Sequence, residues 1–292
     1  MATFSADVRV LVCANCGAAL PPVGEGGGQV ECGFCHVVTF VGVRDDGSLA
    51  SGAAGDENAR IAGLWRQIDQ GFAIHPEVFG LMENSELPER NVAAAMQMWE
   101  KTRKIASDPA QAPGVGDDLL WLTTALAGYF AGTGDRVRIR ALWESTLDAS
   151  YGPRQRQFVR GALCRLSVND GDLDAAGRWL RPCDPQANDL CSDSTYRQSY
   201  ACMATANGEF ENVMQALGPD PDALPWFFTM RLISSVYRAN AIERLGDLAR
   251  AVSQLNALGA AMPDAAATLR SIQQANAALD LCPQSIAMIA SP

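Results

Sequence analysis

Two Cys-x-x-Cys pairs near the start of the chain have the residue types and spacing best suited to chemistry. The first pair is Cys13 and Cys16, the second is Cys32 and Cys35, and fifteen residues separate the pairs. This spacing is typical of zinc sites, because each pair places two thiolates on one tight turn and two turns complete a tetrahedron. The sequence therefore predicts one bound Zn²⁺, although the spacing alone leaves iron open as the metal.

All four predicted ligands are thiolates, so no coordination position is left for water or a substrate. A closed site of this kind favours a structural role. His36 directly follows the second pair and offers another donor, but four ligands already suffice, and we interpret it as an exposed neighbour.

The residues around the cysteines indicate a small β domain over residues 1–43. Short β-prone runs lie at 8–12 and 37–41, and a turn-rich run with several glycines lies between the pairs at 21–28. This layout resembles the zinc-ribbon family. The resemblance covers about residues 8–43 and is carried by the four cysteines and Gly17. Residues 44–57 are small, polar and glycine-rich, which predicts a flexible linker.

From residue 58 onward the pattern becomes helical, and one short motif recurs in it. A glycine followed by an acidic residue returns at intervals of 37, 37 and 38 residues. The four copies are Gly134-Asp135, Gly171-Asp172, Gly208-Glu209 and Gly246-Asp247. We predict that each glycine ends a helix in the left-handed conformation and that each acidic residue opens the next helix.

The positions around each glycine repeat as well, which predicts four helical hairpins that bury the same face. Seven residues before the glycine stand the small residues Ala127, Cys164, Ala201 and Ala239. Nine residues after it stand the large residues Trp143, Leu180, Leu217 and Leu255. Five residues after it stand Ile139, Ala176, Val213 and Ala251, and two residues after it stand Leu173, Phe210 and Leu248 in three of the copies.

These positions resemble the tetratricopeptide repeat, most clearly in Gly171-Asp172-Leu173-Asp174-Ala175-Ala176 and at residues 246–251. The resemblance implies a right-handed α-solenoid over residues 58–282. The period departs from the 34 residues of the family, and the bulky residue of the first helix is replaced by Thr123, Arg160, Arg197 and Ser235. The extra residues fall in proline-bearing joints at 181–185 and 218–221.

Both ends of the helical region are less regular. We expect helices over 59–72 and 88–106, a loop over 108–116, and a capping helix over 263–281. Residues 283–292 are expected to form a tail.

Composition excludes several classes of protein. The chain has 292 residues, 48% of them hydrophobic and 19% charged, which is enough apolar material for a sizeable core. Its formal charge of −10 argues against general nucleic-acid binding. No secretory signal or bilayer-length apolar run is visible, so we expect a cytoplasmic protein without membrane insertion. The five remaining cysteines lack ligand spacing and are expected to be buried as small apolar groups.

No nucleophile, phosphate-loop or catalytic-metal motif is present in the sequence, so we do not expect an enzyme. On the tetratricopeptide analogy, the first helices would line a concave face that binds a protein or peptide. The residues expected there are Trp121, Thr124, Phe158, Arg165, Gln198, Asn240 and Glu243, with Arg165 and Asn240 as donors to a peptide carboxylate. Packing between repeats is the alternative role for the aromatic residues.

The function predicted from the sequence is a non-catalytic protein-interaction adaptor or scaffold with a structural zinc. The alternative is a transcription-linked regulator whose ribbon contacts nucleic acid or polymerase. Residues 1–44 carry only Arg9 and Arg44 against Asp7, Glu25 and Glu31, which disfavours phosphate binding by the ribbon itself.

Metal removal tests the zinc prediction. A segment this short needs a staple to fold, so the free energy of metal binding becomes the folding free energy of the ribbon. We expect complete chelation to make residues 1–43 sensitive to limited proteolysis and to leave the helical region intact. Unchanged protease sensitivity of residues 1–43 after metal removal would contradict the prediction.

Overall fold

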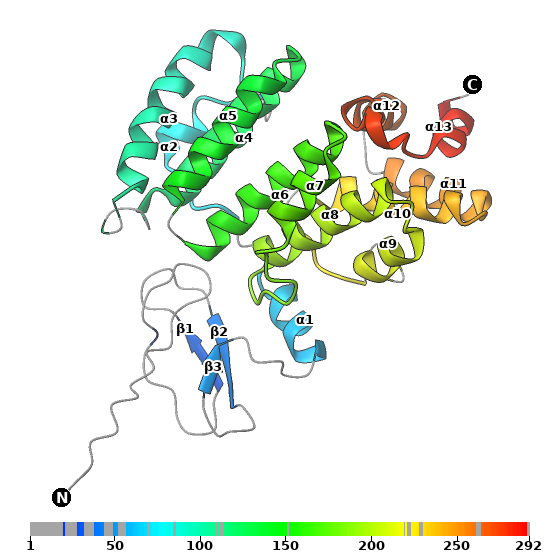
Figure 1. Ribbon diagram of the computed structural model, residues 1–292, viewed down its shortest axis with the longest axis horizontal. Coiled ribbons are helices and arrows are strands. Elements are labelled where there is room, and N and C mark those ends of the chain that lie inside the picture. The colour runs from blue at the N-terminus through cyan, green and yellow to red at the C-terminus, as the bar shows by residue number, and fades with distance from the viewer. Residues whose placement is uncertain are drawn as a thin grey trace, which may run out of the picture.

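The structure is a computed structural model, and it is mainly helical (Figure 1). It describes residues 20, 28–31, 38–43, 49–51, 57–68, 71–83, 86–108, 110, 114–150, 152–218, 220, 223–227, 230–260 and 264–290. Helices that follow one another in the sequence pack against one another, in the manner of a helical-repeat protein.

A small antiparallel sheet precedes the helices. Its strands are β1 (Gly28–Glu31), β2 (Val38–Val43) and β3 (Leu49–Ser51), in the order β1-β2-β3. In β1 and β2, Gly28 pairs with Val41 and Glu31 with Val38, which confirms the β-prone run predicted at 37–41. β3 falls within residues 44–57, where the sequence predicted a linker, and it pairs with the end of β2.

The first helical elements are α1 (Glu57–Trp65), α2 (Pro76–Phe79), the 3₁₀ turn η1 (Glu89–Asn91) and α3 (Val92–Ala106). The helical stretch predicted at 88–106 is confirmed. The helix predicted over 59–72 is wrong in its second half, because α1 ends at Trp65 and residue 72 lies outside any helix. The physical reason is that tertiary contacts replace the helix there. The side chain of Gln67 hydrogen-bonds to residues 188 and 190, and the ring of Phe72 packs against aromatic residues of the hairpins described next.

Four helical hairpins follow in series (Figure 1). They are α4 (Gly116–Gly132) with α5 (Arg136–Ala149), α6 (Pro153–Asn169) with α7 (Leu173–Leu180), α8 (Leu190–Ala206) with α9 (Phe210–Leu217), and α10 (Met230–Arg244) with α11 (Leu248–Gly259). The predicted proline-bearing joints lie between α7 and α8 and between α9 and α10.

The repeated glycine makes the turn inside each hairpin, as predicted. The φ angles of Gly134, Gly171, Gly208 and Gly246 are +76°, +78°, +74° and +95°. Glycine adopts this left-handed region without the steric cost that a Cβ would add. The four turns therefore share one backbone conformation.

The acidic residue after each glycine is the N-cap of the second helix. The side chains of Asp135, Asp172 and Asp247 each accept a hydrogen bond from the backbone N–H three residues later. Such a cap satisfies one of the free N–H groups at the helix start. Glu209 holds the same position, but its carboxylate accepts a hydrogen bond from the side-chain amide of Asn212 at 2.9 Å and not from a backbone N–H of the helix.

The predicted packing positions are buried in every hairpin. The small residues Ala127, Cys164, Ala201 and Ala239 and the large residues Trp143, Leu180, Leu217 and Leu255 all belong to the core. The position two residues after the glycine is not buried in this way: Leu173 is 37% exposed, and Phe210 and Leu248 are half-buried. Two of the substituted positions have partners of their own. Thr123 accepts a hydrogen bond from the Trp99 indole at 2.9 Å. The Arg197 guanidinium donates to the carboxylate of Asp193 at 2.7 Å and lies 3.9 Å from the Trp226 ring centre.

Helices α6 and α8 pack closely at Gly161. A Cβ at this position would lie 2.3 Å from Cγ2 of Thr195 and 2.8 Å from Oγ of Ser199. Both neighbours are buried side chains of α8. The absence of a side chain at Gly161 therefore sets the distance between the second and third hairpins.

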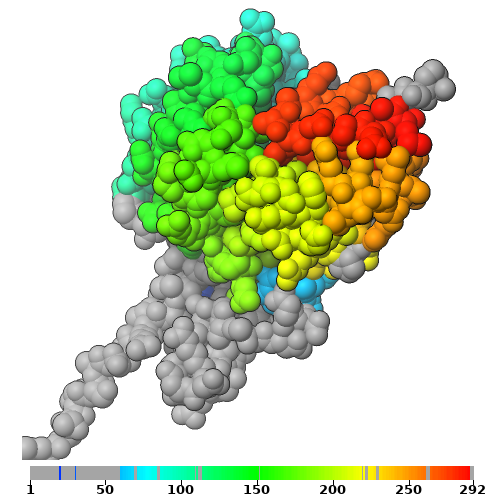
Figure 2. Space-filling view, turned by 45° about the vertical axis from the view of Figure 1, so that its right-hand side comes forward, coloured from blue at the N-terminus to red at the C-terminus, as the bar shows by residue number. Residues whose placement is uncertain are grey.

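The C-terminal residues fold back on the hairpins as α12 (Ala265–Ala275), the 3₁₀ turn η3 (Ala277–Leu279) and α13 (Pro283–Ala290). η3 contacts α6 and α8, and α13 packs on α11. Figure 2 shows these residues in red beside the green and orange helices. The tail predicted for 283–292 is wrong over α13, because the carboxylate of Glu243 accepts hydrogen bonds from the N–H groups of Gln284 and Ser285 at its start.

Among the described residues, no helix is both long and apolar enough to cross a bilayer.

Substitution of Gly161 by alanine tests the close helix approach. We expect Gly161→Ala to lower the free energy of unfolding by about 1–3 kcal/mol, because the added methyl overpacks the contact with α8. Gly128→Ala in α4 is the matched control: nothing lies within 4 Å of the added Cβ, and the helix gains up to about 1 kcal/mol. Urea titrations compare the two variants, and equal effects would contradict the role assigned to Gly161.

Candidate functional site

The predicted zinc ligands Cys13, Cys16, Cys32 and Cys35 lie outside the described residues. Residues 32–37, which include the second pair, connect β1 to β2 in the sequence. Within the described ranges, no group of three or more histidine, cysteine or acidic residues is placed to hold a metal ion. The zinc site therefore stays a prediction.

The predicted partner-binding residues divide into two groups. Trp121 and Phe158 meet at one aromatic cluster. Arg165 and Asn240 lie elsewhere, each with a partner in the chain itself: Nη1 of Arg165 donates to Oγ of Ser199 at 2.7 Å, and Oδ1 of Asn240 accepts from the N–H of Cys282 at 2.9 Å. Asn240 is 1% exposed, so the peptide-carboxylate role predicted for it is not available in this arrangement.

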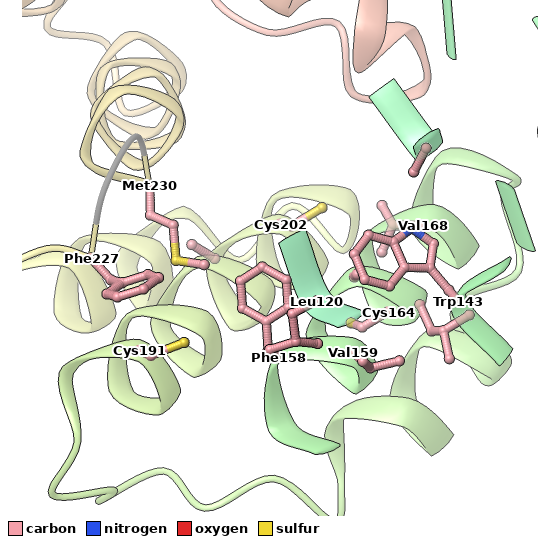
Figure 3. Close-up of a cluster of buried hydrophobic side chains, with 14 of the residues drawn as sticks. Leu120, Trp143, Phe158, Val159, Cys164, Val168, Cys191, Cys202, Phe227 and Met230 are labelled. Atoms are coloured by element: carbon pink, nitrogen blue, oxygen red, sulfur yellow. The ribbon is translucent and has the colours of Figure 1, made fainter. Parts of the chain in front are cut away.

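Phe72 is the centre of the aromatic cluster. Its ring centre lies 6.4 Å from that of Trp121, 5.6 Å from Phe158 and 5.0 Å from Phe227, each in an edge-to-face arrangement. Edge-to-face pairs at these distances are favourable beyond the area they bury. Figure 3 shows two of these partners in the buried core, with Phe158 between Phe227 on one side and Trp143 on the other.

The segment that carries Phe72 runs from residue 71 to residue 79, and we call it the strap. Its side chains alternate: Phe72 and Ile74 are half-buried, whereas Ala73 and His75 are exposed. This alternation is that of an extended chain with one face against the protein. The strap then forms α2, whose Phe79 stacks on Trp121 with ring centres 6.2 Å apart.

Two carboxylates in the first turn of α4 bind the backbone of the strap. Oδ2 of Asp117 accepts the N–H of Ala73 at 2.9 Å, and Oδ1 of Asp118 accepts the N–H of His75 at 2.7 Å. Burial raises the pKa of the Asp118 carboxyl, and the hydrogen bond from the His75 backbone acts in the opposite direction. Both aspartates lie in the first turn of a helix, where negative charge is favourable.

Arg154 joins the aromatic and acidic parts of the site. Its guanidinium carbon lies 5.4 Å from the centre of the Phe72 ring and 5.6 Å from that of Phe227. Its Nη1 lies 3.9 Å from Oδ2 of Asp117. A guanidinium placed over aromatic faces and near a carboxylate is attracted by both.

Two long-range contacts hold the chain just before the strap. Nη1 of Arg60 lies 2.6 Å from Oδ1 of Asp193 in a largely buried ion pair. The amide of Gln67 donates to the carbonyl of Asn188 and accepts from the N–H of Leu190, both at 2.9 Å. These contacts tie α1 and the turn after it to the start of α8.

An apolar groove of about 600 Å³ lies beside the strap along α4. Trp121, Thr124, Gly128 and Tyr129 of α4 line it, together with Met82 and Leu87 from the chain after α2. Thr124 was expected on a partner-binding face, and it lines this groove.

The C-terminal residues cover part of α10, the first helix of the fourth hairpin. In addition to Asn240, Glu243 is enclosed there: its Oε2 accepts hydrogen bonds from the N–H and the hydroxyl of Ser285. The hydroxyl of Tyr237 donates to Oδ1 of Asn276 at 3.1 Å. Gln198, also expected on the open face, is 2% exposed.

Sequence reasoning missed Phe72, Arg154 and Phe227 as members of this cluster. Gly71 in front of Phe72 was the one local signal against continuing the helix. The partners of Phe72 lie far along the chain, and no spacing rule connects them.

The five cysteines outside the predicted zinc site are free and buried, as expected. Burial raises the pKa of the thiols of Cys164 and Cys191 to about 12, and of Cys183 and Cys202 to about 11. A thiol held in its neutral form is a poor nucleophile, so these residues serve packing.

Comparison of the chain with protein-family models, curated proteins and solved structures found no significant match.

The buried thiols predict a loss of stability in alkali. Above the ordinary thiol pKa of about 9.0, an unfolded chain releases the Cys164 proton while the folded chain keeps it, so unfolding becomes more favourable as pH rises from 9 towards 12. One such thiol contributes up to about 1.4 kcal/mol per pH unit. We expect the urea midpoint to fall less steeply with pH in Cys164→Ala than in the unsubstituted protein. Equal slopes between pH 9 and 11 would contradict this account.

Proposed function

We propose that this protein is a non-catalytic adaptor, in which a structural zinc ribbon precedes a right-handed, tetratricopeptide-like solenoid that binds a protein or peptide. The observation that supports the proposal best is the series of four hairpins with the same left-handed glycine and the same buried positions. Serial hairpins of this kind offer an extended surface made by equivalent helices, which is a surface for macromolecules rather than for small substrates.

In this proposal Cys13, Cys16, Cys32 and Cys35 hold one Zn²⁺. Four thiolates suit zinc and close the site, so the ion supplies folding free energy to the ribbon and takes no part in a reaction. The chain's own carboxylates, guanidiniums and aromatic rings at the start of α4 and α6 are the groups that we expect to contact a partner.

The described cysteines are buried thiols that burial holds in the neutral form. Each of the described cysteines has a raised pKa. The negative net charge of −10 favours a protein partner over nucleic acid.

Affinity purification from the native host, after crosslinking and nuclease treatment, tests the proposal. We expect a discrete protein partner that survives the nuclease. A matched purification with Cys32→Ser/Cys35→Ser shows which part of the chain binds the partner. Loss of the partner would indicate that the ribbon binds it, and retention would indicate that the helical region binds it.

Recovery that depends on intact nucleic acid would contradict the adaptor function. That result would favour the alternative, a transcription-linked regulator, for which binding of the isolated chain to DNA or RNA would weaken steeply with salt.

A further inference from the structure

The strap is bound to the helical region in the way that an extended peptide is bound by a receptor. It contributes one aromatic anchor, Phe72, and two backbone N–H groups, those of Ala73 and His75. Its alternate side chains face solvent. Recognition through an anchor side chain and main-chain hydrogen bonds is a general mode of peptide binding.

The receptor is made entirely by elements that follow the strap in the sequence. Trp121 and the two aspartates come from α4, Phe158 and Arg154 come from α6, and Phe227 precedes α10. Trp121 and Phe158 also hold equivalent positions, thirteen residues before the glycines of their hairpins. The site is therefore a feature of the repeats and not of the strap.

The chemistry of the receptor selects its ligand. Two neighbouring carboxylates that accept N–H groups exclude an anionic ligand and favour a main chain. The aromatic cluster with Arg154 above it favours an aromatic side chain. The spacing is fixed by the strap: the N–H groups that bind belong to the first and third residues after the aromatic one.

The extended part of the strap, residues 71–75, has the features of a segment that opens locally, whereas Val78 of α2 is 4% exposed and belongs to the core. The N–H bond from Ala73 to Asp117 is exposed to solvent, and so are the side chains of Ala73 and His75. Segments with exposed hydrogen bonds and few buried contacts open at lower free energy than the core. The groove along α4 lies beside the site and offers further apolar contact to a longer ligand.

We propose that the cluster of Trp121, Phe158, Phe227 and Arg154, with the Asp117–Asp118 pair, is a binding site for an extended segment of a partner protein that carries an aromatic residue. The strap is the intramolecular occupant of this site, and the partner segment displaces it. This inference rests on the proposed adaptor function and names the chemistry of the partner.

The strap itself supplies the probe. A fluorescent synthetic peptide with the sequence of residues 68–79, Ile-Asp-Gln-Gly-Phe-Ala-Ile-His-Pro-Glu-Val-Phe, is titrated with the full chain and followed by anisotropy. In the unsubstituted protein the tethered strap competes at a high effective concentration. We expect Phe72→Ala to weaken this competitor and to bind the peptide at least ten-fold more tightly than the unsubstituted protein does.

Three controls make the result specific. A peptide in which the phenylalanine equivalent to Phe72 is replaced by alanine should not bind. Adding Asp117→Ala and Asp118→Ala to Phe72→Ala should abolish binding of the original peptide. Val137→Ala, at a position on α5 that is 83% exposed, should behave as the unsubstituted protein.

A folded Phe72→Ala variant that does not bind the peptide would overturn the proposal. Concentration-dependent dimers without peptide binding would overturn it too, because they would assign the site to the strap of a second copy. Hydrogen exchange on the unsubstituted protein gives an answer even if the variant does not fold. We expect the amides of Ala73 and His75 to exchange faster than those of α6 and α8, and exchange only through global unfolding would overturn the proposal.

This test is independent of the affinity purification, because it uses the purified chain and a synthetic peptide. Peptide binding without a recovered protein partner would support the binding site and contradict the adaptor function. A recovered partner without peptide binding would support the adaptor function and contradict this binding site.

Discussion

A three-residue turn with a left-handed glycine at its centre is the constraint on which the hairpins depend. This backbone conformation at Gly134, Gly171, Gly208 and Gly246 ends one helix and lets the next begin after a single further residue. The small residues seven positions earlier are buried, and the thiol of Cys164 lies against the carbonyl of Ser199 in α8. Gly161 extends the same principle to the contact between hairpins, because no side chain fits between α6 and α8. Backbone freedom and small side chains together set the spacing of the helices.

The two ends of the helical region use the surface that the hairpins create. The strap lies against α4, the first helix of the first hairpin, where Asp117 and Asp118 bind its backbone. The C-terminal residues lie against α10, the first helix of the fourth hairpin, where Asn240 and Glu243 bind their backbone. Carboxylate and amide side chains on the first helices therefore satisfy the main chain of segments that have no sheet or helix partner of their own at these points. The same property is the basis of our proposal that this face binds a main chain from another protein.

The elements predicted correctly from the sequence are those specified by local signals. The glycine and the acidic residue of each turn are neighbours, and the buried positions stand at fixed distances before and after them. The sequence alone therefore predicted the hairpins. The strap and α13 were not, because the groups that fix them are distant: His75 and Asp118 are 43 residues apart, and Gln284 and Glu243 are 41 apart. Family analogy placed Trp121 and Phe158 at a binding face and left out Phe72, the residue that fills it. It also placed Asn240 there, where the C-terminal residues cover it.

The central claim is that Phe72 occupies the aromatic cluster of the repeats in solution. Incorporation of the photo-crosslinking amino acid p-benzoylphenylalanine in place of Phe72, followed by mass spectrometry of the monomer, tests it directly. The account predicts links within one chain from position 72 to peptides of α4 or α6 that contain Trp121 or Phe158. A folded monomer with no links to either helix would contradict it.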